Sequence, residues 1–279
     1  MPKIGVFCHM HYRDQYLSMR DYLMKIPYEF DLYLSTSSPG NADYLRELFA
    51  PWPRVTIELV PNRGRDVAPK LVTFRDAHAK YDYVLWLHTK GSYWQWRAHI
   101  LDTLISTPST VAAIIEKFEA APRLGVIAAE HWPPIIPWVN WCFNKPLAKQ
   151  LATRAGIKLT PFWRRSPLPD TIDFPSGTMF WARPAALRPL LDLNLTFDEF
   201  PPEPIGRDGT IAHALERMIY LSAIHAGYQW TTVTVTDNGF RQKFARPTSR
   251  PARSLYYRMR RQWRHSRARL PDAAPQPAG

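Results

Sequence analysis

Short apolar runs alternate along this chain with longer amphipathic segments. Short runs are typical of buried strands, and segments whose apolar residues recur every three or four positions are typical of helices. Strands are predicted at residues 4–8, 30–34, 55–60, 83–87, 125–129, 173–183 and 230–235. Helices are predicted at residues 13–25, 42–49, 68–80, 98–105, 110–120, 146–155, 184–191 and 210–226.

The order of these elements predicts an α/β fold. Strands that alternate with helices form a mostly parallel central sheet with helices on both faces, in a Rossmann-like arrangement. Residues 130–170 interrupt the alternation because they are rich in Trp and Pro, and only the helix at residues 146–155 is predicted there.

Two polar clusters follow predicted strands. Residues 62–66 (Asn-Arg-Gly-Arg-Asp) follow the strand at 55–60, and residues 88–92 (His-Thr-Lys-Gly-Ser) follow the strand at 83–87. Consecutive strands of a parallel βαβ unit point the same way, so both clusters are expected at the carboxyl edge of the sheet. Open α/β sheets bind their ligands at that edge, which is therefore the strongest candidate for a functional site.

The first cluster has the composition of an anion-binding turn. Gly64 lies between Arg63 and Arg65, and arginine binds phosphate through two parallel hydrogen bonds. Asn62 and Asp66 can hydrogen-bond a sugar or a base. The alternative is an ordinary surface turn in which Asp66 caps the next helix.

The second cluster supplies His88, Thr89 and Lys90. Lys90 can bring positive charge to an anionic ligand, and His88 can hydrogen-bond a phosphate or a sugar hydroxyl. The alternative for His88 is a partly buried histidine with partners inside the protein. No pair of carboxylates accompanies these residues, so the cluster supplies poor ligands for a hard cation, and no metal ligand is predicted.

Two later segments can complete a cleft. Ser176 and Gly177 are small residues at which a sugar can approach the backbone. Asp208 precedes the helix at 210–226 and is a candidate general base, with Glu203 as the reserve candidate. A general base accelerates a reaction by roughly 10²–10⁴-fold. The alternative is that Asp208 only caps the helix.

His213 and Arg217 are four residues apart in the same predicted helix. Residues at this spacing share one helix face. They are candidate contacts to a sugar or an acceptor, or part of a surface stripe with Glu216 nearby.

Composition and charge divide the chain into two parts. Its 279 residues are 46% apolar, enough for a globular body with a sizeable core. The net charge is +12, but the chain from Arg246 onward has nine arginines and one acid, Asp272, a net of +8 that leaves about +4 for the first 245 residues. Residues 254–270 carry Leu255, Met259 and Trp263 at a spacing of four among arginines, which predicts a basic amphipathic helix. We expect a folded domain at residues 1–245, and at 246–279 this helix and a disordered tail.

The two cysteines and the N-terminal segment bear on the compartment. Cys8 and Cys142 are too few for a disulfide framework, which favours a reducing compartment, and Cys8 is expected to be a small buried residue. The N-terminal apolar run is too short for a secretory signal, and no segment approaches the ~20 apolar residues of a membrane span. We expect a cytoplasmic protein, soluble or peripheral to the membrane.

Four stretches together carry a family resemblance: NRGRDVAP, LHTKGS, FPSGTMFWARPAAL and DGTIAHALER. In this order and spacing the chain resembles the rhamnan synthesis protein F family over roughly residues 4–238. The resemblance implies a GT-A-like glycosyltransferase of surface polysaccharide or lipopolysaccharide O-chain synthesis, with dTDP-L-rhamnose as the implied donor. The wider GT-A group usually has Asp-x-Asp where this chain has residues 88–90, so a Mg²⁺ or Mn²⁺ requirement is not carried over.

Within that resemblance the candidate residues take roles. Arg63, Arg65 and Lys90 would hold the diphosphate of a nucleotide-sugar donor, and Asp208 would deprotonate the acceptor hydroxyl in an inverting transfer. The acceptor would be a glycan, held on a lipid at the inner face of the cytoplasmic membrane.

The basic segment at residues 253–270 suits an anionic membrane, because each Lys or Arg near such a surface contributes ~1 kcal/mol and Trp263 suits the interface. Arginine-rich helices also bind nucleic acid, but the body of the chain shows no nucleic-acid motif, so that partner is disfavoured.

Two other interpretations stay open. The chain can be a non-catalytic protein that docks on a membrane or nucleic acid through a degenerate nucleotide-sugar fold. A weaker possibility is a phosphoester hydrolase that uses Asp208 and His213.

Overall fold

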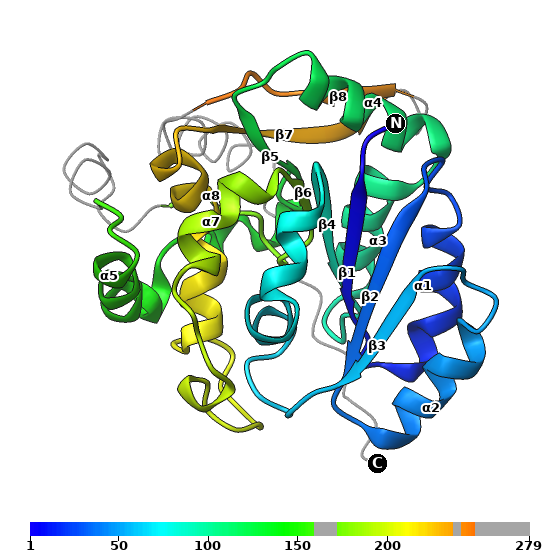
Figure 1. The fold of residues 1–279 in the computed structure, drawn as a ribbon. Helices are drawn as coiled ribbons and strands as arrows, with labels where there is room; N and C mark the ends of the chain where they lie inside the picture. Colours follow the sequence, from blue (N-terminus) through cyan, green and yellow to red (C-terminus); the bar gives the residue numbers. More distant parts are fainter. Residues whose placement is uncertain (159–171, 237–240, 249–279) are drawn as a thin grey trace.

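The structure is a computed structural model that describes residues 1–158, 172–236 and 241–248. Its centre is one eight-stranded sheet with the strand order β3-β2-β1-β4-β6-β5-β7-β8 (Figure 1). The strands are β1 (Ile4–His9), β2 (Phe30–Thr36), β3 (Val55–Leu59), β4 (Tyr83–His88), β5 (Leu124–Ala129), β6 (Phe180–Ala182), β7 (Gln229–Thr236) and β8 (Arg241–Phe244). The predicted helix at 254–270 and tail at 271–279 lie outside the described residues.

The sheet is mostly parallel, which confirms the expected GT-A-like α/β class. Strands β1 to β4 run parallel, β6 inserts antiparallel between β4 and β5, and β7 runs parallel to β5. Strand β8 pairs antiparallel with β7 and was not predicted. After β8, the Thr248 backbone forms two further hydrogen bonds with Trp230.

The predicted strand at 173–183 is wrong for most of its length. Only Phe180–Ala182 forms β6. Gly177 and Thr178 have positive φ angles of 88° and 54°, which extended backbone does not allow, so the chain turns before the strand begins. Residues 172–178 consequently lie at the sheet edge as a loop.

Helices cover both faces of the sheet (Figure 1). One face packs against α1 (Tyr16–Leu23), α2 (Pro39–Leu48), α3 (Trp94–Ile105) and α4 (Pro108–Glu119). The other packs against α5 (Lys145–Arg154), α7 (Pro184–Leu191) and α8 (Ile211–His225), together with η2 (Pro69–Thr73) and η3 (Arg75–Lys80). Short 3₁₀ turns complete the described elements: η1 (Arg13–Gln15), η4 (Pro133–Trp138), η5 (Cys142–Asn144) and η6 (Phe197–Glu199).

Among the described helices, none is by itself long and apolar enough to cross a membrane. Only α3 and α4 taken together, with a 65° bend between them, reach that length and composition.

Two apolar layers form because side chains alternate along the buried strands. In β1, Val6 and Cys8 face the layer under α1 to α4, and Phe7 faces the other layer. In β4, Trp86 lies under η3 and packs against Phe180 of β6 with the two rings tilted and their centroids 5.0 Å apart. Cys8 is buried as expected, and burial raises the pKa of its thiol to about 12.

The predicted helix at residues 68–80 is two helical turns of different kinds. The Phe74 amide donates to the Pro69 carbonyl, five residues back, at 3.0 Å, which gives η2 the wide turn of a π-helix. The wide turn brings the adjacent side chains of Lys70 and Leu71 both into the core. A 3₁₀ segment, η3, then continues to Lys80.

His78 of η3 is a buried neutral imidazole. Its Nε2 accepts the indole N–H of Trp86 at 2.9 Å, so the ring proton resides on Nδ1, which donates to the Phe74 carbonyl at 2.8 Å. Burial lowers the pKa of His78 to about 4. Burial also lowers the pKa of His9 to about 3 and that of His213 to about 4.

These histidines predict a loss of stability in mild acid. Below pH ~6.5 the unfolded chain binds protons that the folded protein excludes, so the free energy of unfolding falls by about 1.4 kcal/mol per pH unit for each such histidine. The fall should continue to about pH 4, where His78 and His213 protonate in the folded state. Urea unfolding of the wild type and of His78→Phe across this range measures the slope. In the variant, the slope of the free energy of unfolding against pH should be smaller by about one histidine's contribution. An unchanged slope would show that His78 is not held neutral.

Candidate functional site

Five segments meet at the carboxyl edge of the parallel strands. They are residues 60–66 after β3, 89–92 after β4, 130–144 after β5, 172–178 before the antiparallel β6, and 203–210 before α8. Strand β3 is the edge strand, and β2 and β1 separate it from β4. The segment after β3 crosses that gap (Figure 1), so that Asp66 Oδ2 lies 4.0 Å from His88 Nε2. The structure thus brings the two predicted clusters together.

A buried ion pair lies beneath this edge. The Lys70 ammonium, 1% exposed, donates to Asp66 Oδ2 at 2.9 Å. Burial alone would raise the pKa of Asp66, but the nearby His88 and Lys70 outweigh burial and hold the pKa below its usual range. Asp66 is therefore neither a helix cap nor a free ligand-binding carboxylate, because Lys70 already occupies it.

His88 and Thr89 are also occupied by the protein. The ring nitrogens of His88 lie 2.8 Å from the Thr89 carbonyl and 2.7 Å from the Gly177 carbonyl. The Thr89 hydroxyl accepts the backbone amides of His11 and Tyr12 at 2.8 and 3.0 Å. Burial lowers the pKa of His88, and the carboxylate of Asp66 opposes that effect. Both side chains join the end of β4 to neighbouring loops.

Lys90 places a cation at the carboxyl edge of the sheet, two residues after the end of β4. The Gln15 side chain fixes its backbone, accepting from the Lys90 amide at 2.9 Å and donating to the Lys90 carbonyl at 3.1 Å. The ammonium lies 3.8 Å from the centroid of the Trp96 ring, and no carboxylate of the described residues pairs with it within 4.0 Å. Burial lowers the pKa of Lys90, Glu216 and Asp66 oppose that effect, and Arg65 adds to it.

The two arginines of the first cluster diverge. Arg63 pairs with Asp198 at 2.8 Å, whereas Arg65 donates to His213 Nε2 at 3.1 Å and to the Gly206 carbonyl at 3.0 Å. Arg65 is close enough to Lys90 to affect its pKa, and Arg63 does not contribute to that effect. Of the two arginines, Arg65 is therefore the one whose charge acts on Lys90.

The turn that separates the arginines requires glycine. Gly64 has a φ of 69°, and a β-carbon there would lie 2.5 Å from side-chain atoms of Ala68 and Phe200. Asn62 is exposed at the start of this turn, and its carbonyl accepts the Glu203 amide at 3.3 Å.

His213 of α8 is neutral with a defined tautomer. Its Nε2 faces the Arg65 guanidinium, which can only donate, so the proton lies on Nδ1, 2.8 Å from the Thr210 hydroxyl. Burial lowers the pKa of His213 to about 4, and Arg65 adds to the effect. The imidazole holds Arg65 in place, and because it is neutral it cannot act as a general acid at neutral pH.

Asp208 is held by the segment after β5 and by Arg217 of α8, the helix that it precedes. Its carboxylate accepts from the Asn144 amide at 2.6 Å, the Phe143 backbone amide at 3.1 Å and the Arg217 guanidinium at 3.2 Å. Burial raises the pKa of Asp208, but these three donors outweigh burial and lower it. The capping alternative is excluded, because the N-cap residue of α8 is Thr210.

Glu203 has fewer partners than Asp208. Its Oε2 accepts the Ile205 amide at 2.8 Å. Its Oε1 is buried without a hydrogen-bond partner among the described groups, and the nearest cation is Arg65 Nε at 3.6 Å. Both candidate bases therefore lie in the 203–210 segment, one saturated and one only partly satisfied.

The sequence interpretation missed Glu216 as a site residue. Its Oε1 accepts the Gly177 amide at 2.8 Å and the Thr178 hydroxyl at 3.2 Å, and Arg217 is 3.5 Å from its Oε2. Glu216 lies three residues after His213 on α8, so the same helical spacing that selected His213 and Arg217 could have selected it.

His131 and Asp173 were missed as well. His131 Nδ1 lies 2.8 Å from the Ser176 hydroxyl and its Nε2 lies 2.9 Å from Asp173 Oδ1. These bonds join the segments flanking β5 and β6. Ser176 is buried, and a β-carbon at Gly177 would lie 2.9 Å from Ile100, so both small residues have packing partners where a sugar contact was predicted.

The residues at the end of β4 do not fit a divalent ion. His88 and Lys90 stand where two carboxylates would be needed, and Asp66 is paired with Lys70. Within residues 1–158, 172–236 and 241–248, no three His, Cys, Asp or Glu side chains are grouped so that they could hold a metal.

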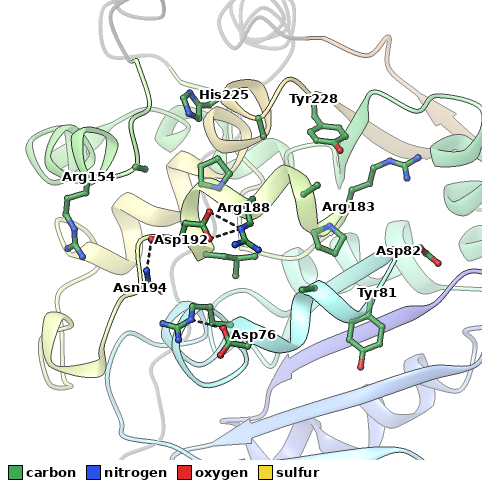
Figure 2. Close-up of a pocket in the computed structure, with 18 residues that line it drawn as sticks. Asp76, Tyr81, Asp82, Arg154, Arg183, Arg188, Asp192, Asn194, His225 and Tyr228 are labelled. Carbon is green, nitrogen blue, oxygen red and sulfur yellow. Dashed lines mark hydrogen bonds and ion pairs between the residues drawn. The ribbon is translucent and has the colours of Figure 1, made fainter.

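A cavity lies at the opposite edge of the sheet. This cavity of about 1160 Å³ is near the amino ends of β4 and β7, and Tyr81 and Tyr228 line it (Figure 2). Some of its charged groups pair with one another, as Arg188 does with Asp192 at 2.7 Å. Arg183 donates to the Phe118 carbonyl at 2.8 Å. The carboxyl edge, with its unpaired Lys90, is the better candidate.

Fold and site together define an α/β protein of the GT-A-like class with Arg63, Arg65 and Lys90 at the carboxyl edge of its sheet. The chain belongs to the rhamnan synthesis protein F family, whose model matches residues 1–228. Two curated relatives, both called uncharacterized protein WxcX, come from strains of Xanthomonas campestris pv. campestris. Each is 34% identical over 243 residues, which is 84% of this chain and 33% of the relative. The chain thus spans about a third of the length of these relatives.

Solved structures of S. aureus TarS residues 1–349 are also similar. The match has 12% sequence identity and a TM-score of 0.45, or 0.43 for the complex with UDP, over 84% of this chain and 58% of TarS.

The interaction of Arg217 with Asp208 and Glu216 predicts a measurable coupling. Replacing Arg217 by Met should lower the free energy of unfolding by about 2–3 kcal/mol, because two largely buried carboxylates lose their cation. Asp208→Asn should lower the free energy of unfolding less in the Arg217→Met background than in the wild type. The difference, which is the coupling energy, should be about 1 kcal/mol. A urea double-mutant cycle measures this.

The matched control is Arg188→Met, which breaks the exposed pair with Asp192 and should cost less than about 1 kcal/mol. Equal costs for Arg188→Met and Arg217→Met would contradict the assignment.

Proposed function

We propose that this chain is a glycosyltransferase domain that moves a sugar from a nucleotide-diphosphate donor to a glycan acceptor. The observation that carries the proposal is the Lys90 ammonium at the end of β4, which is partly buried, lies over the Trp96 ring and has no carboxylate partner among the described residues. Removing part of a cation's hydration is costly unless an anion pairs with it. A diphosphate supplies such an anion, and the carboxyl edge is where sheets of this kind bind ligands.

The donor would lie over the end of β4. Lys90 and Arg65 would contact its diphosphate, with Arg65 held by His213 and the Gly206 carbonyl. Asn62 and Arg63 are exposed or partly exposed on the same turn and would contact the nucleoside. His88, Thr89 and Asp66 would act as positioning residues, because their side chains hold the loops that carry Lys90 and Arg65.

The proposed chemistry is a single displacement. An acceptor hydroxyl loses its proton to a carboxylate as its oxygen bonds to the anomeric carbon of the donor sugar. The bond from that carbon to the diphosphate oxygen breaks, and the nucleoside diphosphate leaves with the electron pair. Lys90 and Arg65 stabilise the developing negative charge. Attack opposite the leaving group inverts the anomeric centre.

Asp208 is the proposed base. It is ionised at neutral pH, and Asn144 and Arg217 fix its orientation. Its three donors also make it a weak base, and that observation supports a second candidate function, a non-catalytic nucleotide-sugar-binding protein.

The family description supports the finer assignments. Because the family is described by rhamnan synthesis, the first donor to test is an activated rhamnose, dTDP-L-rhamnose. The product would be a polysaccharide or a lipopolysaccharide O-chain. We propose that the acceptor is lipid-linked and that the basic segment at 253–270 keeps the domain at the inner face of the cytoplasmic membrane. That segment and the domain boundary at residue 245 remain sequence predictions.

Donor-dependent release of a nucleoside diphosphate tests the proposal. Asp208→Asn should reduce turnover roughly 10²–10⁴-fold, because the amide cannot accept the proton, while donor affinity stays near that of the wild type. Glu203→Gln is the matched comparison in the same segment and should change turnover by less than about tenfold.

If Glu203→Gln instead shows the large loss of turnover, Glu203 is the base. If Asp208→Asn turns over the donor as fast as the wild type does, Asp208 is not the base. Donor binding without turnover under any condition supports the non-catalytic function.

A further inference from the structure

Trp96 lies near the start of the helix that follows the second polar cluster. It lies in the first turn of α3, where its amide donates to the Tyr93 carbonyl at 3.0 Å. Its ring carries the Lys90 ammonium on one face, 3.8 Å from the centroid. Nothing in the sequence interpretation had assigned it a role.

The indole N–H of Trp96 lacks a partner. Its Nε1 is buried and has no hydrogen-bond acceptor among the described groups. A buried donor left unpaired costs about 1–3 kcal/mol. Trp86 and Trp181 donate their indole N–H groups to His78 and to the Leu104 carbonyl, whereas the indole N–H of Trp230, in the core, is also buried without a partner among the described groups. An unpaired donor at a ligand-binding edge indicates that a ligand supplies the acceptor.

The Trp96 ring packs against the loop before β6. A β-carbon at Gly177 would lie 3.4 Å from Trp96 Cζ2 and 3.6 Å from Cε2, the carbon bonded to Nε1. The N–H edge therefore borders the 176–178 turn, whose Gly177 amide is bound by Glu216 and whose Gly177 carbonyl is bound by His88. Trp96 thus lies between the end of β4 and the loop before β6.

Two unmet requirements coincide at this place. Lys90 needs a negative charge, and the Trp96 N–H needs an acceptor oxygen. A phosphoryl group meets both, because it carries charge and several strong acceptor oxygens. A neutral sugar hydroxyl would satisfy the indole and leave the ammonium unpaired, and a monatomic anion would lack the several acceptor oxygens.

We infer that Trp96 is an anion-binding residue whose indole N–H donates to a phosphoryl oxygen of a diphosphate that also pairs with Lys90. The aromatic face holds the ammonium in one place through a cation–π contact before the ligand arrives, which reduces the ordering cost of binding. The inference rests on the proposed function for the identity of the ligand and deepens it by naming a second contact to the diphosphate.

Trp96→Phe tests the inference, because it removes the indole N–H and keeps a smaller aromatic ring that can lie beneath Lys90. Calorimetric titration with pyrophosphate, UDP, dTDP and uridine compares the variant with the wild type. The diphosphates should bind roughly 10–100-fold more weakly, the loss expected for a hydrogen bond to a charged group. Uridine, which has no phosphate, should bind both proteins equally.

Trp94→Phe is the matched control. Trp94 lies two residues earlier in the same helix and is exposed, so its replacement should leave every affinity unchanged. In addition, the indole ¹⁵N–¹H resonance that disappears in Trp96→Phe should shift when pyrophosphate is added to the wild type, and the Trp94 resonance should not.

The outcomes separate the inference from the proposed function. The inference is overturned if Trp96→Phe binds diphosphates as tightly as the wild type and the Trp96 resonance of the wild type does not shift. The glycosyltransferase proposal would then still stand. Pyrophosphate binding that depends on Trp96, without turnover of any nucleotide sugar, supports the anion site and counts against the transferase. A wild type that binds none of these anions overturns both.

Discussion

The buried pair of Lys70 with Asp66 is the interaction on which the site depends. It forms where the chain returns from the edge strand β3 to the centre of the sheet, and it places Asp66 beside His88 at the end of β4. Removing either partner would leave a charge in a region that excludes water, which typically costs 3–5 kcal/mol. The pair therefore fixes the crossing segment, and with it the turn that carries Arg65.

Above this pair, most polar side chains are used to hold loops and few are free for a ligand. His88, Glu216 and His131 each join segments that are distant in the sequence. This division explains how an edge built from five segments keeps a defined shape. It also sets Lys90 and Trp96 apart, because no described residue supplies a carboxylate to Lys90 or an acceptor to the Trp96 indole.

Much of this architecture could be predicted from the sequence, because buried strands and amphipathic helices leave periodic apolar patterns. The patterns located the parallel strands and placed residues 62–66 and 88–92 at one edge. They failed at residues 173–179, where positive φ angles at Gly177 and Thr178 replace a strand by a turn. They also could not show that Asp66 is occupied by Lys70 or Asp208 by Asn144, since such pairing arises only when distant segments pack together.

The central claim is that a protein cation, Lys90, holds the diphosphate at the end of β4. The most direct measurement is calorimetric titration of pyrophosphate in excess EDTA, with the wild type and with Lys90→Met, a variant of similar length that removes the charge. We expect the wild type to bind pyrophosphate without divalent metal and Lys90→Met to bind it at least about tenfold more weakly. Binding that requires added metal and is unaffected by Lys90→Met would contradict it.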